Sequence, residues 1–137
     1  MLEKYYKYKM NYKKYIIFIR IGVFYECIDK DALIINQLFN YKIKRISNTF
    51  KVGFPIKNID DITNKLKDEN INYIIVDNDK LVDKSDSSIN KYNKFNLDRE
   101  NILYNFLRIE KIVNYIENNI MNNDISDKLD RIEMVIE

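Results

Sequence analysis

The sequence predicts an α/β fold: a single small domain with a mixed sheet flanked by helices, followed by a C-terminal helical hairpin. Through the first 77 residues, short runs of β-branched and aromatic residues alternate with segments of helical periodicity, which is typical of α/β domains. Residues 98–137 show helical periodicity alone. A chain of 137 residues can bury one core, so several separate domains are not expected.

The N-terminal segments predict helix, strand, strand and helix in that order. Residues 2–14 predict a helix, and residues 15–21 form an almost continuous β-branched and aromatic run, typical of a central strand covered on both faces. Gly22 permits a turn or bulge, after which residues 24–28 continue extended. Asp29 is expected to cap a helix that begins at residue 29 or 30.

The next segments complete the predicted domain. Residues 41–46 predict an exposed strand, residues 50–54 a short strand that Pro55 ends, residues 59–68 an amphipathic helix and residues 72–76 a buried strand. The sequence turns polar from residue 77 to residue 96. We therefore expect a domain at residues 1–82, a linker or loop at 83–97 and a helical extension at 98–137.

The helical extension carries apolar residues at alternating spacings of four and three. The first series is Ile102, Phe106, Ile109, Val113, Ile116 and Ile120, and a second helix from about residue 124 aligns Leu129, Ile132 and Ile136. Two interpretations are open at this point. The hairpin pairs with a second copy or docks a partner protein, or it folds onto the α/β core.

Charge divides the chain into a basic and an acidic half. Residues 1–58 hold 12 Lys or Arg against 4 Asp or Glu, whereas residues 59–137 hold 11 against 17. A basic half suits a partner lined with phosphates, although local drift in a lysine-rich sequence gives the same pattern.

The composition excludes several kinds of chemistry. The chain has no His and one cysteine, Cys27, so we expect no metal site and no internal disulfide. Its two glycines cannot build a glycine-rich phosphate loop, so no cofactor or ATPase is expected. No membrane span or signal peptide is recognisable, which favours a cytoplasmic location. The sequence therefore indicates a binding protein, not an enzyme.

The segment Gly22-Val23-Phe24-Tyr25-Glu26 is the strongest candidate site. On a strand, alternate side chains share a face, so Phe24 and Glu26 are expected to project together while Tyr25 points the other way. An aromatic ring beside a hydrogen-bonding carboxylate is suited to testing a nucleobase.

The motifs around this segment resemble a known family. Tyr5-x-x-x-Lys9-x-x-Tyr12 precedes the strand, Asp31-Ala32 opens the following helix, and Val52-Gly53-Phe54-Pro55 comes later. Together with Gly-x-Phe-Tyr-Glu, they resemble the N-terminal mismatch-recognition domain (domain I) of the DNA mismatch repair protein MutS, over roughly residues 2–77. Two departures are Val23 in place of the family's usual Asp and Lys57 in place of its usual His.

The resemblance implies a role for each motif residue. In the family the matching Phe stacks on the mispaired base and the matching Glu hydrogen-bonds to it, so these roles pass to Phe24 and Glu26. The residues expected as scaffold of the motif are Gly22, Tyr25, Gly53 and Pro55. The candidates for contacts to the DNA backbone are Lys4, Lys7, Lys13, Lys42, Lys44, Arg45 and Lys51.

Two functional hypotheses follow. The first is a stand-alone module without ATPase activity that binds mismatched or distorted double-stranded DNA. The second is a protein-interaction or modulator module for a repair or mobile-element enzyme, which docks through residues 98–137.

Overall fold

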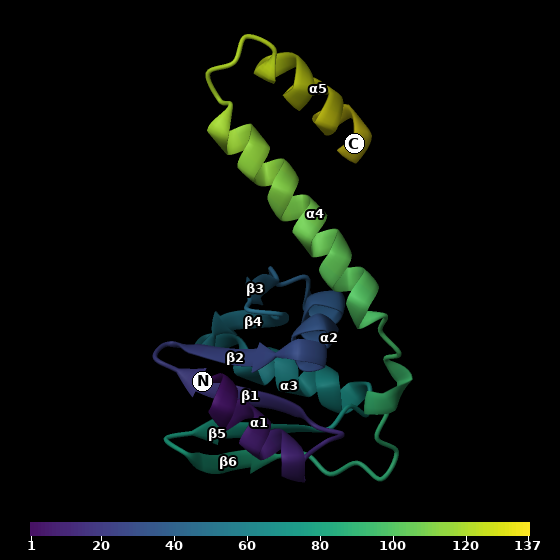
Figure 1. Ribbon diagram of the computed structural model, residues 1–137. Coiled ribbons are helices and arrows are strands. Elements are labelled where there is room, and N and C mark those ends of the chain that lie inside the picture. The colour runs from purple at the N-terminus through teal and green to yellow at the C-terminus, as the bar shows by residue number, and fades with distance from the viewer. The chain divides into compact units, whose positions relative to one another are not determined.

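The computed structural model describes residues 1–137, which form two compact units, Met1–Asp98 and Arg99–Glu137. The first unit is a mixed sheet of six strands with helices packed against it, and the second consists of two helices (Figure 1). This confirms the predicted fold class.

The first unit contains three α-helices, two 3-10 turns and six strands. In chain order they are α1 (Leu2–Asn11), β1 (Ile16–Ile21), β2 (Phe24–Ile28), α2 (Asp29–Phe39), β3 (Lys44–Ile46), β4 (Thr49–Pro55), η1 (Ile56–Asn58), α3 (Ile59–Asp68), β5 (Tyr73–Asp77), β6 (Lys80–Lys84) and η2 (Tyr92–Lys94). The strand order is β3-β4-β2-β1-β5-β6. Only the β1–β5 pair is parallel, and the other four pairs are antiparallel.

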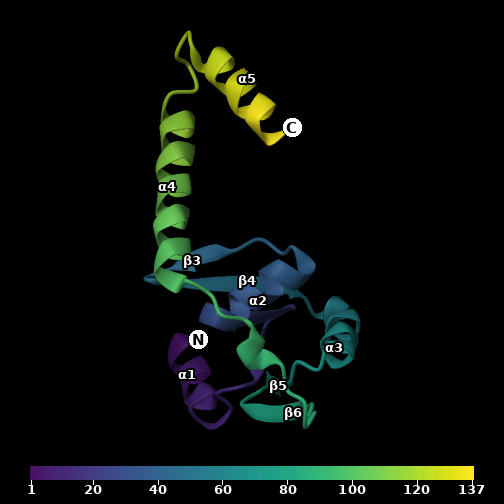
Figure 2. The ribbon, with the colours of Figure 1, turned by 90° about the vertical axis from the view of Figure 1, so that its right-hand side faces the viewer.

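Both faces of the central strands are covered. On one face, Tyr5 of α1 packs with Ile17, Ile19 and Ile28, and β5 extends this cluster. Phe18 and Phe54, in edge-to-face contact at 5.5 Å between ring centroids, belong to the other face. Helices α1 and α3 lie on opposite sides of the sheet (Figure 2). The continuous apolar run of β1 is explained by this double cover.

Three elements differ from their sequence predictions. Helix α1 ends at Asn11, short of residue 14, and β3 begins only at Lys44. Helix α2 has Ile28 at its N-cap position with no side-chain cap, so the prediction that Asp29 caps it is wrong. The backbone of Asp29 has a φ of 57°, so the chain turns sharply at this residue as it enters the helix.

The segment expected as a linker or loop is bound to the first unit. Its first two residues, Asp83 and Lys84, belong to an extra edge strand, β6, whose five residues are all exposed. Beyond β6, Asn90 donates a hydrogen bond to the Lys14 carbonyl at 2.6 Å, and the ring of Tyr92 is buried. Residues 83–97 therefore pack as part of the Met1–Asp98 unit.

The second unit is a helical hairpin of α4 (Arg99–Asn118) and α5 (Ile125–Ile136). Ile125 is its one buried side chain, and Lys128 donates a hydrogen bond to the Tyr115 hydroxyl at 2.5 Å. Many apolar side chains of the two helices stay exposed, including Ile109, Val113 and Val135.

Candidate nucleic-acid interface

Phe24 stands at the tip of the hairpin that joins β1 to β2. The loop has two residues, Gly22 and Val23, and Gly22 has a φ of 61°, the left-handed value that a type II′ turn requires at its first position. The backbone N–H of Ile56 donates to the Val23 carbonyl at 3.0 Å, and Pro55 lies opposite Phe24 on β4. This bracing holds an aromatic side chain that is 44% exposed.

Glu26 shares a face of the sheet with Phe24, as the alternation of a strand requires. Its side chain is only 16% exposed, and its Oε2 lies 3.4 Å from Nζ of Lys51, which is 25% exposed. Gly53 is directly across from Glu26 on β4, and a Cβ at Gly53 would lie 3.6 Å from both Cγ and Oε2 of Glu26. The Glu26 carboxylate therefore lies against the backbone of Gly53 and beside the ammonium group of Lys51.

Tyr25 points to the opposite face. It is buried beside Phe54, with ring centroids 6.1 Å apart, and burial followed by the charge of Asp77 raises the pKa of its hydroxyl. Tyr25 thus packs on the face of the sheet opposite to Phe24 and Glu26.

The seven candidate backbone contacts occupy several places in the first unit. Lys44 and Lys51 are direct cross-strand neighbours, so they share the face of Glu26. Arg45 points to the other face and donates to the Ser47 carbonyl at 2.9 Å. Lys4 pairs with Asp79, and the remaining candidates, Lys7, Lys13 and Lys42, are exposed. The strand register therefore places Phe24, Glu26, Lys44 and Lys51 on one face of the sheet, with Glu26 and Lys51 in contact and Phe24 at the hairpin end. We call these four residues the reading face.

A buried carboxylate, Asp31, joins side chains of α1 and η2 to the backbone of β1. It is 0% exposed and accepts hydrogen bonds from the Tyr5 hydroxyl and from the Tyr92 hydroxyl at 2.6 Å. Lys9 donates to both of its oxygens at 2.9 and 3.0 Å, and the Ile17 N–H donates at 3.1 Å. In the sequence, Tyr5, Lys9 and Asp31 are recognisable only as members of two separate motifs. Their spacing on two helices does not reveal that they meet.

The same network governs the ionisation of the groups around it. Burial, then the charge of Asp31, raises the pKa of the Tyr5 and Tyr92 hydroxyls, so both stay protonated as donors. Burial raises the pKa of the Cys27 thiol, which is fully enclosed. These residues therefore support the fold and do not supply a nucleophile.

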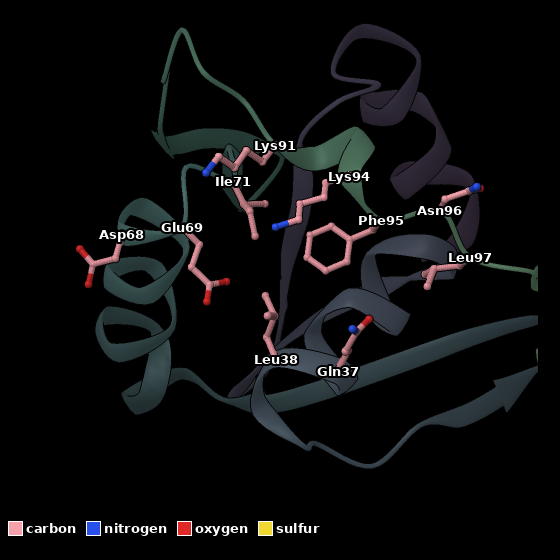
Figure 3. Close-up of a pocket in the computed structure, with 10 residues that line it drawn as sticks. All are labelled: Gln37, Leu38, Asp68, Glu69, Ile71, Lys91, Lys94, Phe95, Asn96 and Leu97. Atoms are coloured by element: carbon pink, nitrogen blue, oxygen red, sulfur yellow. The ribbon is translucent and has the colours of Figure 1, made fainter.

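A pocket of about 570 Å³ lies elsewhere on the first unit, between α2, α3 and the segment around η2. Leu38, Ile71, Phe95 and Leu97 are its apolar lining residues, and Glu69 and Lys94 are among its charged ones (Figure 3). None of the residues predicted as a site lines it. No group of three or more Cys, Asp or Glu side chains is arranged to hold a metal ion, and no helix is long and apolar enough to cross a membrane.

Comparisons with known proteins bear on this geometry. The family model described as MutS domain I matches residues 1–99, which include the whole reading face and the Asp31 network. A search of curated proteins gave no match.

Proposed function

The chain belongs to the MutS domain I family, and from this premise we propose that it binds double-stranded DNA and recognises mismatched or distorted sites. The observation that carries the proposal is the exposed ring of Phe24, held at a braced hairpin tip on the same face as Glu26. A large apolar side chain kept in solvent by a rigid turn suits insertion between bases.

Selection of a defect follows from the cost of opening the stack. Unstacking a normal base step costs a few kcal/mol, and the cost is lowest where a base is mispaired or unpaired. Stacking on an aromatic ring contributes about 1 to 3 kcal/mol, which matches the opening cost at a defect but not that cost plus bending of a perfect duplex. Phe24 therefore supplies discrimination without reading a sequence.

Glu26 supplies a second test of the base. Phosphates repel a carboxylate, so its approach becomes favourable only where a base edge donates a hydrogen bond to it. A properly stacked pair offers no such contact. Glu26 therefore weakens binding to intact duplex, and a hydrogen bond from a base at a defect offsets this repulsion.

Contacts to the DNA backbone come from basic side chains of the first unit. Lys44 and Lys51 lie on the reading face. Lys7, Lys13 and Lys42 are exposed elsewhere on the same unit. A module of this size buries about 600 to 1,000 Å² on DNA, so its affinity should be modest and should fall with salt. The proposed activity is binding, with no chemical step and no need for ATP.

The test is a titration of the purified chain against a matched duplex and the same duplex with one mismatch or one unpaired base, at fixed salt. We expect tighter binding to the defective duplexes. Phe24→Ala should remove about 1 to 3 kcal/mol of that preference, and Phe24→Leu should not restore it, because leucine has no ring to stack.

The matched control is Val23→Ala, which trims the neighbouring turn residue, itself 66% exposed. This variant should keep the preference. Equal affinity for all duplexes, or a preference that survives Phe24→Ala, contradicts the proposal.

The exposed apolar residues of α4 and α5 favour a second role, in which residues 98–137 bind another protein. Ile109, Ile112 and Val113 are 42–55% exposed on α4, more apolar surface than a helix in water normally leaves open. A second copy bound here would join two reading faces in one molecule, which raises the avidity if both faces bind the same DNA. The alternative occupant is a repair or mobile-element enzyme that this chain modulates.

The molar mass of the full chain, measured by light scattering, distinguishes binding of a second copy from binding of another protein. Pairing predicts a dimer that Ile109→Glu dissociates and that Lys111→Glu, an exposed change on the same helix, leaves intact. A monomer at all concentrations rejects the homodimer and leaves partner docking as the association to seek.

A further inference from the structure

Lys51 stands in contact with the residue assigned to read the base. The Lys51 Nζ to Glu26 Oε2 distance is 3.4 Å, and both side chains are mostly covered, at 25% and 16% exposure. Ion pairs in such partly enclosed places are screened less than pairs in open solvent. Salt therefore weakens this pair less than it weakens an exposed pair, and both residues belong to the reading face.

The cross-strand register explains how the two side chains meet. Lys51 lies opposite Ile28, and Glu26 lies opposite Gly53, so the two are diagonal neighbours across β2 and β4. Diagonal neighbours are within reach of long side chains. Gly53 has no side chain, and a Cβ there would lie 3.6 Å from the Glu26 carboxylate, so the carboxylate occupies the space beside Gly53.

We propose that Lys51 is a positioning residue that acts through Glu26: it neutralises the carboxylate when no base engages it, and so sets how strongly the protein rejects intact duplex. This inference rests on the function proposed above. On a matched duplex no base bonds to Glu26, so Lys51 stays on the carboxylate and softens its repulsion from the phosphates. At a defect the base supplies the partner, and Lys51 is needed less.

The two possible roles of Lys51 predict different results. If Lys51 acts through Glu26, Lys51→Met weakens binding to matched duplex more than to defective duplex, and the preference rises. If Lys51 only contacts a phosphate, Lys51→Met weakens both equally and the preference is unchanged.

The experiment measures affinities of the full chain for a matched duplex and for the same duplex with one mismatch. Lys51→Met should raise the preference roughly 3- to 10-fold, in the lower range of coupling between contacting residues. In a Glu26→Gln background the same change should leave the preference unaltered. Lys51→Arg should behave as wild type, and Lys44→Met, the cross-strand neighbour on the same face, should weaken both duplexes alike.

The outcomes separate this inference from the proposed function. If Lys51→Met weakens binding to the matched and the mismatched duplex equally, in the wild-type and in the Glu26→Gln background, the positioning role is overturned and Lys51 is a phosphate contact. If the wild-type protein binds the matched and the mismatched duplex with equal affinity, the proposed function is overturned and this inference with it. Should Lys51→Met fail to fold, Lys51→Gln replaces it, and additive melting temperatures in the Glu26→Gln, Lys51→Gln cycle would show that the two side chains do not interact.

Discussion

The hydroxyl of Tyr92 donates a hydrogen bond of 2.6 Å to Asp31, a carboxylate that lies 61 residues earlier in the chain and is fully buried. Lys9, which pairs with Asp31, also donates to the Tyr92 hydroxyl at 2.9 Å. One side chain thus joins the segment after β6 to the first turn of α2 and to α1. This contact ties residues 83–97 to the α/β unit.

We expect Tyr92→Phe to destabilise the first unit. The change keeps the ring but removes a donor from a buried charge, which costs about 1 to 3 kcal/mol. Thermal unfolding followed by circular dichroism measures the loss. Tyr104→Phe, which alters a tyrosine 60% exposed on α4, should leave the melting temperature of the first unit unchanged. Equal effects of the two changes would show that the Tyr92 contact does not stabilise the unit.

Shortening the chain tests the same contact in another way. Residues 1–98 contain the whole Asp31 network and should fold with a cooperative transition. A chain that ends at residue 90 lacks Tyr92 and uncovers the Asp31 site, so it should unfold at a lower temperature. Proton-detected NMR spectra and melting curves of the two chains give the comparison. A chain ending at residue 90 that is as stable as residues 1–98 contradicts the role given to Tyr92.

Stability should fall in alkaline solution. Burial raises the pKa of Tyr5 well above its ordinary value of 10.0 and that of Cys27 well above 9.0. The unfolded chain releases these protons near the ordinary values while the folded chain keeps them. The contribution to stability is therefore complete below about pH 9 and is lost as the pH rises further.

Melting temperatures measured between about pH 8 and pH 11 check this expectation. Tyr5→Phe should flatten the decline above about pH 10, because the hydroxyl whose pKa differs between the two states is gone. Tyr104→Phe is the control and should keep the slope of the wild-type protein. An unchanged slope in Tyr5→Phe would place the alkaline sensitivity elsewhere.

The sequence predicts the fold where its residues carry a local pattern. The β-branched run of β1, the apolar stripe of α2 and the helical spacing around Ile109 each depend on neighbours in the chain. The sequence does not predict strand β6, because all its residues are exposed at the sheet edge and apolar residues do not alternate along it. Edge strands owe their existence to pairing with a neighbour, here β5, and local composition does not show it.

The sequence likewise predicts only part of the candidate site. Strand alternation is enough to place Phe24 and Glu26 on one face and Tyr25 on the other. The Glu26–Lys51 pair depends on the register between β2 and β4, which the sequence does not state. The meeting of Asp31 with Tyr92 depends on tertiary packing across most of the first unit. Local pattern thus predicts which residues face outward, and only the assembled sheet shows what they touch.

The two glycines of the chain are expected to respond to substitution in opposite ways. Gly22 has open space around its Cα but a φ of 61°, so Gly22→Ala strains the backbone and should cost about 1 kcal/mol or more. Gly53 has no such φ, and a Cβ there would make ordinary contacts at 3.6 Å with Glu26. Gly53→Ala should therefore leave the melting temperature unchanged or raise it slightly, because it restricts the unfolded chain.

A larger side chain at the second glycine separates stability from function. Gly53→Val extends beyond Cβ into the space beside Glu26, so it should push the carboxylate away from its diagonal with Lys51 and lower the preference for mismatched duplex while the fold persists. Melting curves and duplex titrations on Gly53→Ala and Gly53→Val give both quantities. If Gly53→Val keeps the full preference of the wild-type protein, then the bare backbone opposite Glu26 is not what presents the carboxylate to the base.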